Sequence, residues 1–188
     1  MLILGLGHKA RHGKNYLAKT LVQHCAKRGI YAQEYAFADA VKAYCRVAFG
    51  MREKDATLLQ FVGTDVFRKH QPDIWVRVLA DTLHEQRPEV AIITDLRFPN
   101  EMQMIKDRAG YTVRVTRTQA DGSPWVAPDR DPNHLSETAL DHSHFDFELT
   151  AVSGNLVSLY QDGIQLFDQL WSVYAVAYAA APAGGMER

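Results

Sequence analysis

The sequence predicts a three-layer α/β fold in which a wound, mostly parallel sheet carries helices on both faces. Apolar, strand-like segments alternate with segments of helical periodicity, which is the pattern of strand–helix–strand units. Residues 90–94 form a continuous apolar run between turn residues, typical of a central parallel strand buried on both faces. The 188 residues, 47% of them hydrophobic, suit one domain, expected at 1–178, with a disordered Ala/Gly/Pro-rich tail at 179–188.

The first half of the chain is expected to hold two strands and four helices. The opening segment is apolar throughout, and the helix that follows it is closed by Gly29, a natural helix stop. Apolar residues then recur at helical spacing as far as Pro88. The expected elements are strand 1–7, helix 14–28, strand 30–37, helices 39–49 and 55–70, and one more helix between Pro72 and Pro88.

The second half is expected to alternate in the same way around one irregular stretch. Strand 90–94 is followed by a helix that Gly110 stops and by another apolar strand. Residues 118–144 contain several prolines, glycines and aspartates and little apolar periodicity, which predicts a loop or a mobile lid. The expected elements are helix 99–109, strand 111–116, lid 118–144, strand 145–152 and a closing amphipathic helix at 155–178.

Composition excludes several classes of protein. A net charge of -1 and a pI near 6.7 provide no general basic field, so we expect no nucleic-acid partner. Neither a signal segment nor an apolar run of membrane-spanning length is present, so we expect no membrane association and a cytoplasmic location. Cys25 and Cys45 fall in expected helices and are interpreted as buried free thiols of a reducing compartment.

Residues 7–15 join the first strand to the first helix and contain two glycines and a lysine, Gly7, Gly13 and Lys14. Backbone N–H groups of such a loop, the helix N-terminus and the lysine together bind phosphate. Five residues separate the glycines instead of the usual four, and Asn15 stands where a Mg²⁺-binding hydroxyl is usual. An ordinary strand–turn–helix connection is the alternative, but the position between a strand and an amphipathic helix favours a nucleoside triphosphate site.

A carboxylate and a guanidinium follow the expected central strand, at Asp95 and Arg97. Ligands bind at the carboxyl ends of parallel strands, where this pair can steer Mg²⁺ and a phosphate together. The alternative is that Asp95 caps the following helix and Arg97 pairs with Glu101, although capping is compatible with a site.

Other arginines and a tryptophan are weaker candidates. Arg68 and Arg77 lie on expected helices, where Arg can bind an acceptor phosphate or simply face solvent. Trp75 can stack on a base, but its well-formed apolar stripe favours a core position. The cations around the lid that can close over a γ-phosphate are Arg114, Arg117 and Arg130.

Several motifs in this order resemble the bacteriophage-type deoxynucleoside monophosphate kinases, a family of small P-loop kinases. The resemblance covers residues 1 to about 150. The motifs are Gly-x-Lys-x-x-x-Gly-Lys at residues 7–14, Phe-Ala-Asp-Ala-Val-Lys at 37–42, Gln-Phe-Val-Gly-Thr-Asp at 60–65 with Arg68, Trp-Val at 75–76, Thr-Asp-Leu-Arg-Phe-Pro-Asn-Glu at 94–101 and His-Leu-Ser-Glu at 134–137.

The resemblance implies a P-loop, nucleoside monophosphate kinase-like fold and transfer of the γ-phosphate of ATP to a deoxynucleoside 5′-monophosphate, with Mg²⁺. It implies an acceptor-binding helical region at about 39–87 and, if phage-encoded, the host cytoplasm as the location. Donor nucleotide binding is carried over to Gly7, Lys9, Arg11, His12, Gly13, Lys14, Asn15, Tyr16, Arg117 and Arg130. Acceptor binding is carried over to Asp39, Lys42, Gln60, Thr64, Arg68, Trp75, Arg97 and Glu137, and catalysis to Lys14, Asp39, Arg68, Asp95 and Arg97. Asp95 is the expected metal residue, with Asn15 a second candidate through water.

Two other functions stay open at this point. Family members usually have Asp and then Thr or Ser after the loop lysine, whereas this chain has Asn15 and Tyr16. The departure admits a nucleotide-binding protein whose kinase activity has decayed. A kinase acting on a modified base or another hydroxyl in DNA is the further alternative. A homodimer through the apolar C-terminal helix is possible in principle, but we expect that helix to cover the sheet.

Overall fold

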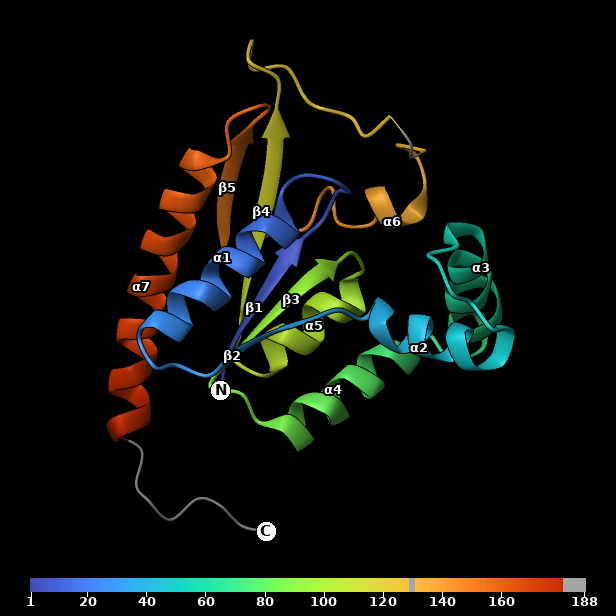
Figure 1. Cartoon of the computed structure of the whole chain (residues 1–188), viewed down its shortest axis with the longest axis horizontal. Helices are drawn as coiled ribbons and strands as arrows, with labels where there is room; N and C mark the ends of the chain where they lie inside the picture. Colours follow the sequence, from blue (N-terminus) through green and yellow to red (C-terminus); the bar gives the residue numbers. More distant parts are fainter. Residues whose placement is uncertain (129–130, 181–188) are drawn as a thin grey trace.

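The structure is a computed structural model that describes residues 1–128 and 131–180. All strands among these residues belong to one parallel sheet (Figure 1). The strand order is β2-β3-β1-β4-β5, and every neighbouring pair is parallel. The wound parallel sheet expected from the sequence is therefore confirmed. The strands are β1 Leu2–Gly7, β2 Ala32–Tyr35, β3 Val90–Leu96, β4 Tyr111–Thr118 and β5 Phe147–Val152.

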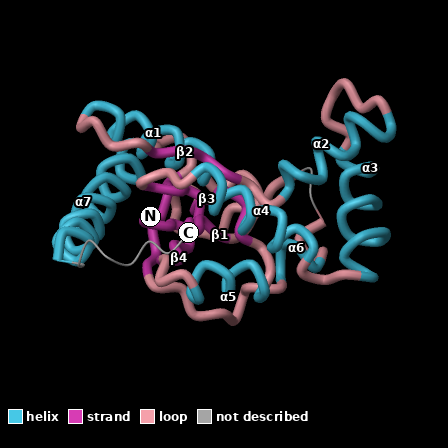
Figure 2. The backbone as a smooth tube through the Cα atoms, turned by 90° about the horizontal axis from the view of Figure 1, so that it is seen from below, coloured by secondary structure: helices cyan, strands magenta, loops and turns pink. Residues whose placement is uncertain are grey.

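Helices cover both faces of this sheet, as expected for three layers. One hydrophobic cluster packs α1 and α7 against one face, and a second packs α2, α4 and α5 against the other. Figure 2 shows the sheet between these helices, with α3 set apart at one end. The helices are α1 Lys14–Lys27, α2 Ala38–Phe49, α3 Ala56–Gln60, α4 Ile74–Gln86, α5 Pro99–Asp107, α6 Leu135–Thr138 and α7 Val157–Ala180.

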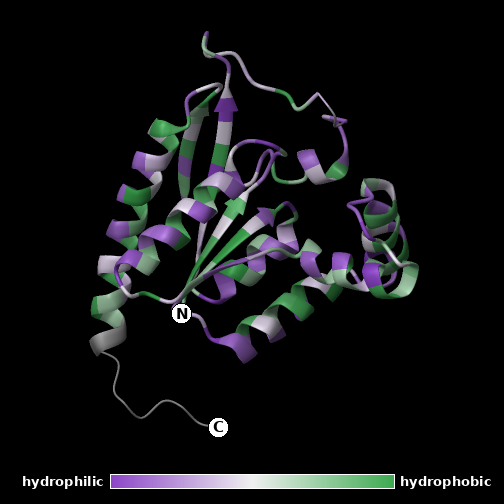
Figure 3. Ribbon diagram, viewed as in Figure 1, coloured by the Kyte–Doolittle hydropathy of each residue, from purple (hydrophilic) through white to green (hydrophobic). Residues whose placement is uncertain are grey.

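The central strands are buried because their side chains are apolar on both faces (Figure 3). All of β1 is buried, and β3 lies between β2 and β1. Two strands are longer than predicted. β3 continues to Leu96 and β4 to Thr118, so Asp95 and Arg117 lie within strands and not after them.

The helix predicted at 55–70 is helical but not regular. After α3 the chain continues as a π-helix, η1 Phe61–Arg68. The indole N–H of Trp75 donates to the carbonyl of Gly63 at 2.9 Å, and a Cβ at Gly63 would press on Val41 at 3.3 Å. Short π segments often occur at functional sites, and this one carries Arg68.

The segment predicted as a lid is partly packed, and the last helix extends into the predicted tail. Within 118–144 the short helix α6 was not predicted, and Ala127, Glu137 and Leu140 are buried, so part of this stretch is packed. α7 runs to Ala180, two residues into the predicted tail, and the remaining tail lies outside the described residues. No helix among residues 1–128 and 131–180 is long and apolar enough to cross a membrane.

Candidate functional site

A cavity of about 820 Å³ opens at the carboxyl ends of β1 and β3, where parallel sheets bind ligands. Its walls come from the loop before α1, from α2, from α3 and η1, from the β3–α5 turn and from α6. Predicted site residues that line it are Arg11, Gly13, Lys14, Asn15, Tyr16, Lys42, Gln60, Thr64, Arg68, Trp75, Asp95, Arg97 and Glu137.

The backbone of the loop before α1 is compatible with the phosphate cradle expected from the sequence. Gly13, the N-cap of α1, has a φ of 99°, and a Cβ there would lie 2.8 Å from Leu159 Cδ2. Only glycine fits both conditions. The first turn of α1 contains no acidic residue, and no side chain caps it. Its partial positive charge therefore faces the cavity without an anion from its own helix.

Lys14 lies at the base of this cradle and is only 5% exposed. Its Nζ donates to the carbonyl of Lys9. Burial, reinforced by the nearby Arg97 guanidinium, lowers the pKa of Lys14 to about 7. The ammonium is thus held where an anionic ligand would stabilise its charge.

Three predicted donor-site residues of the loop and β4 have other contacts and are not among the residues lining the cavity. Lys9 forms an ion pair with Asp141 at 2.8 Å. His12 is buried, and its Nδ1 accepts the backbone N–H of Arg117 at 3.1 Å. The Arg117 guanidinium donates to Ser153 Oγ at 2.8 Å and lies 4.1 Å above the Trp125 ring.

These contacts join the loop to β4 and to Asp141 near the end of the lid, and β4 to Trp125 near its start. Gly7 ends β1 and is also absent from the cavity lining; a Cβ at Gly7 would lie 2.6 Å from the Phe145 ring. Burial is the main cause that lowers the pKa of His12 to about 4, so the ring is neutral there. Arg130 lies outside the described residues.

Asp95 faces the cavity from the end of β3 and accepts two backbone hydrogen bonds. Oδ1 accepts the N–H of Phe37 at 2.8 Å, and Oδ2 accepts that of Ala38 at 2.9 Å. Asp95 thus caps the start of α2. The alternative interpretation, in which Asp95 caps the helix after β3, is wrong. Burial raises its pKa, and the two N–H groups oppose that shift.

The donor set around Asp95 fits Mg²⁺ bound through water. Each carboxylate oxygen keeps a lone pair beyond its N–H contact, and Mg²⁺ characteristically retains several waters. Asn15 lines the same cavity and supplies a neutral amide oxygen. The described residues contain no group of three or more His, Cys, Asp or Glu side chains that could hold a metal by themselves.

Two arginines converge on the cavity, each bound to a different buried glutamate. Arg97 donates to the Glu137 carboxylate and, at 3.0 Å, to the carbonyl of Ser136. Arg68 donates to Glu101 at 2.6 Å, and its guanidinium lies 4.4 Å above the Phe98 ring. The alternative interpretation of the sequence expected an ion pair between Arg97 and Glu101. In the structure the Arg97 side chain instead pairs with Glu137.

Glu137 also connects α6 to the phosphate loop. Its Oε2 accepts the backbone N–H of Ala10 at 2.8 Å. The pKa of Glu137 lies below its usual value: burial acts to raise it, but the Ala10 N–H and the Arg97 charge together outweigh burial. The carboxylate is therefore ionised between two groups that also attract phosphate.

Of the other residues predicted to bind the acceptor, some line the cavity and one does not. Asp39 is exposed, forms an ion pair with Lys42 at 2.7 Å and is not among the lining residues. Lys42, Gln60, Thr64 and Trp75 line the cavity. The lining residues that we did not predict include Lys54, Thr57, Phe98, Glu101, Asp131, His134 and Ser136. Phe98, Glu101, His134 and Ser136 belong to motifs quoted above, which was the available signal.

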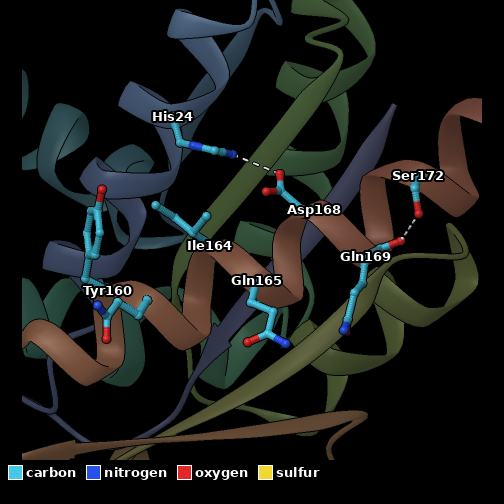
Figure 4. A pocket seen from close by; sticks show the side chains of 8 residues that line it. His24, Tyr160, Ile164, Gln165, Asp168, Gln169 and Ser172 are labelled. Atoms are coloured by element: carbon cyan, nitrogen blue, oxygen red, sulfur yellow. Dashed lines mark hydrogen bonds and ion pairs between the residues drawn. The ribbon is translucent and has the colours of Figure 1, made fainter.

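A second cavity, of about 740 Å³, lies along α7 beside α1 and away from the phosphate loop (Figure 4). His24 Nε2 lies 2.8 Å from Asp168 Oδ1 in its wall, and the other lining side chains are mostly amides, hydroxyls and Ile164. It contains no phosphate-binding backbone, so the candidate site is the cavity at the strand ends.

Sequence comparison finds similar proteins from a virus and a phage. A protein of Acanthamoeba polyphaga mimivirus, provisionally named a deoxynucleotide monophosphate kinase, is 27% identical over 175 residues, 74% of this chain and 82% of that protein. The deoxynucleoside-5′-monophosphate kinase of Escherichia phage T5 is 40% identical over 52 residues, 27% of this chain and 20% of its own length. No protein-family model matches the chain.

Among solved structures, APS kinase of Mycobacterium tuberculosis in complex with AMPPNP and APS aligns with a TM-score of 0.51 and 12% identity. The alignment covers 89% of this chain and 97% of that one, which shows a common fold. The resemblance inferred from the motifs is therefore confirmed: this chain is similar in sequence to proteins named deoxynucleotide monophosphate kinases from a virus and a phage, and it shares the fold of APS kinase.

Proposed function

We propose that this kinase transfers the γ-phosphate of ATP to a deoxynucleoside 5′-monophosphate, giving ADP and a deoxynucleoside diphosphate. The observation that carries the proposal is that Lys14 of the phosphate loop shares one cavity with Arg68 and Arg97. Such a cavity has cations for a donor triphosphate on one side and for an acceptor phosphate on the other. The similarity to viral deoxynucleotide monophosphate kinases supports this acceptor class.

The step itself needs positioning and charge neutralisation more than acid–base chemistry. An oxygen of the acceptor phosphate forms a bond to the γ-phosphorus while the bond from that phosphorus to the β,γ-bridging oxygen breaks. ADP leaves with that electron pair. The acceptor oxygen is already anionic, so no general base is required.

Several cavity residues then have defined roles. The loop N–H groups and Lys14 bind the donor phosphates, and Arg68 and Arg97 hold the acceptor phosphate in line with them. Asp95 would hold Mg²⁺ through water, and the bound ion would neutralise charge on the donor phosphates. Gln60, Thr64 and Trp75 line the part of the cavity proposed for the acceptor nucleoside.

The test is ADP release with Mg²⁺ and ATP against all deoxynucleoside and ribonucleoside monophosphates, with duplex DNA as a further acceptor. We expect turnover of one or more deoxynucleoside monophosphates. Lys14→Ala should lower kcat/KM by about 100-fold or more, because a preorganised charge is removed. Lys19→Ala, an exposed lysine of the same helix, is the matched control and should leave the rate unchanged.

Three results would contradict the proposal. Normal turnover by Lys14→Ala at saturating ATP would remove Lys14 from the site. Activity with DNA alone would favour the DNA-directed kinase, and ATP binding with no acceptor turnover would favour a decayed nucleotide-binding protein.

A further inference from the structure

The proposed transfer assigns no role to the carboxylate of Glu101, a buried charged group of the site. Its side chain is 1% exposed and lies in the first turn of α5. Transferring a carboxylate out of water is costly unless partners compensate. The contacts that Glu101 makes in return therefore indicate what it does.

A helix-capping role explains only one of its two oxygens. A glutamate at the third helical position commonly accepts the N–H of the residue that precedes the helix. Glu101 Oε2 does so, from Phe98 at 3.1 Å and from Arg97 at 2.8 Å. Oε1 is directed elsewhere: it accepts Arg68 Nη2 at 2.6 Å, from η1, 33 residues earlier in the chain.

Arg68 is consequently held on two sides. Glu101 binds one edge of the guanidinium, and the Phe98 ring supports its face at 4.4 Å. The guanidinium has five N–H donors in a fixed plane and lines the cavity, so donors remain for a ligand. A long side chain held in this way loses less conformational entropy when it binds a phosphate.

The same carboxylate also holds the backbone from which Arg97 projects, because Oε2 accepts the Arg97 N–H. One side chain thus connects both arginines of the acceptor side, although η1 and the β3–α5 turn are distant in sequence. Burial raises the pKa of Glu101 to about 7, against the opposing charge of Arg68.

We propose that Glu101 is a positioning residue for the acceptor phosphate, acting through Arg68 and through the backbone of Arg97. The inference rests on the proposed function, because it assigns the acceptor to the side of the cavity that these arginines line. Glu101 itself does not contact the reacting atoms.

Glu101→Gln separates positioning from capping. The amide oxygen of glutamine can still accept the Phe98 and Arg97 N–H groups, but its NH₂ group cannot accept from Arg68. We expect the KM for the acceptor to rise about tenfold or more, since a charge-assisted hydrogen bond is lost. The KM for ATP should stay within about twofold. Asp107→Asn, the same chemical change on an exposed residue of α5, should alter neither constant.

A double-mutant cycle tests whether Glu101 acts through Arg68. Arg68→Ala should raise the KM for the acceptor at least as much as Glu101→Gln does. Adding Glu101→Gln to Arg68→Ala should then have little further effect on this constant, because the interaction is already absent. Thermal unfolding of each variant shows whether a folded protein is being assayed.

The inference and the proposed function fail in different ways. The inference is wrong if wild type turns over monophosphates while Glu101→Gln leaves the acceptor KM unchanged or raises the KM for ATP equally. It is also wrong if the two substitutions act independently. If the wild type turns over no monophosphate, calorimetric titration with the monophosphates, without ATP, separates the two proposals.

Wild-type binding without turnover contradicts only the proposed function. Weaker binding by Glu101→Gln would then still support the inference. A wild type that binds no monophosphate overturns both.

Discussion

Lys14 combines burial with a location beside a second cation, and both features shape how it can bind a triphosphate. Its pKa of about 7 means that the ligand-free protein holds this lysine only partly protonated near neutral pH. A triphosphate placed at the loop would favour the ammonium form, so its pKa would rise on binding.

We therefore predict that ATP binding takes up a proton at pH 8 and takes up much less at pH 5.5, where Lys14 is already protonated. Calorimetric titrations in two buffers with different ionisation enthalpies measure this uptake directly. Lys14→Arg provides the comparison, because a guanidinium does not titrate in this range. Equal heats in both buffers at pH 8 would show that Lys14 does not change its charge on binding.

The contact between α1 and α7 depends on a glycine in the middle of a helix. Glycine in a helix interior costs about 1 kcal/mol relative to alanine, so replacing Gly163 would ordinarily stabilise α7. A Cβ at Gly163, however, would overlap Leu17 Cδ1, and Leu17 is buried in α1. The close approach of the two helices outweighs the local preference.

Gly163→Ala should thus lower the free energy of unfolding by about 1 kcal/mol net, because overpacking costs roughly 1–3 kcal/mol. In a Leu17→Ala background the same change should be neutral or stabilising, since the overlapping atom is gone. Urea unfolding of the four proteins measures both effects. A stabilising Gly163→Ala in the wild-type background would mean that the helices separate at no cost.

At the scale of the whole molecule, the segment 118–144 is attached to the phosphate loop at several points. Near its start the centroid of the Trp125 ring lies 5.8 Å from that of the His12 ring, and near its end Glu137 accepts the Ala10 N–H. Asp141 binds both His8, at 2.7 Å, and Lys9. Between these attachments Asp131 and His134 line the cavity, and His134 Nε2 lies 2.6 Å from the amide of Gln60 across it.

Since the segment touches both sides of the cavity, we predict that bound nucleotides slow its opening. Amide hydrogen exchange in 118–144 should become slower with a non-hydrolysable ATP analogue and a deoxynucleoside monophosphate together than with either alone. The buried strand β3 should exchange equally slowly in all states and is the internal control. Identical exchange in the segment with and without nucleotides would contradict the prediction of a closing lid.

Local pattern was sufficient for much of the fold and part of the site. The apolar run at 90–94 predicted a central strand, and the glycines and lysine before α1 predicted the phosphate loop. Asp95 and Arg97 could be placed at the cavity because the carboxyl end of a buried parallel strand is where ligands bind. These features depend on residues that are close together in the sequence, so the pattern of apolar and polar residues predicts them directly.

Other features depend on which distant segments pack together, and only the tertiary structure decided them. The sequence by itself determined that strands alternate with helices, that a candidate phosphate loop follows the first strand, and that a carboxylate and a guanidinium lie at the end of the central one. The structure decided that Arg97 pairs with Glu137 and Arg68 with Glu101, and that His12 and Arg117 bind each other beneath the lid. Each arginine had several possible carboxylate partners in the sequence, and only the packing of η1, α5 and α6 around β3 brings one of them within reach.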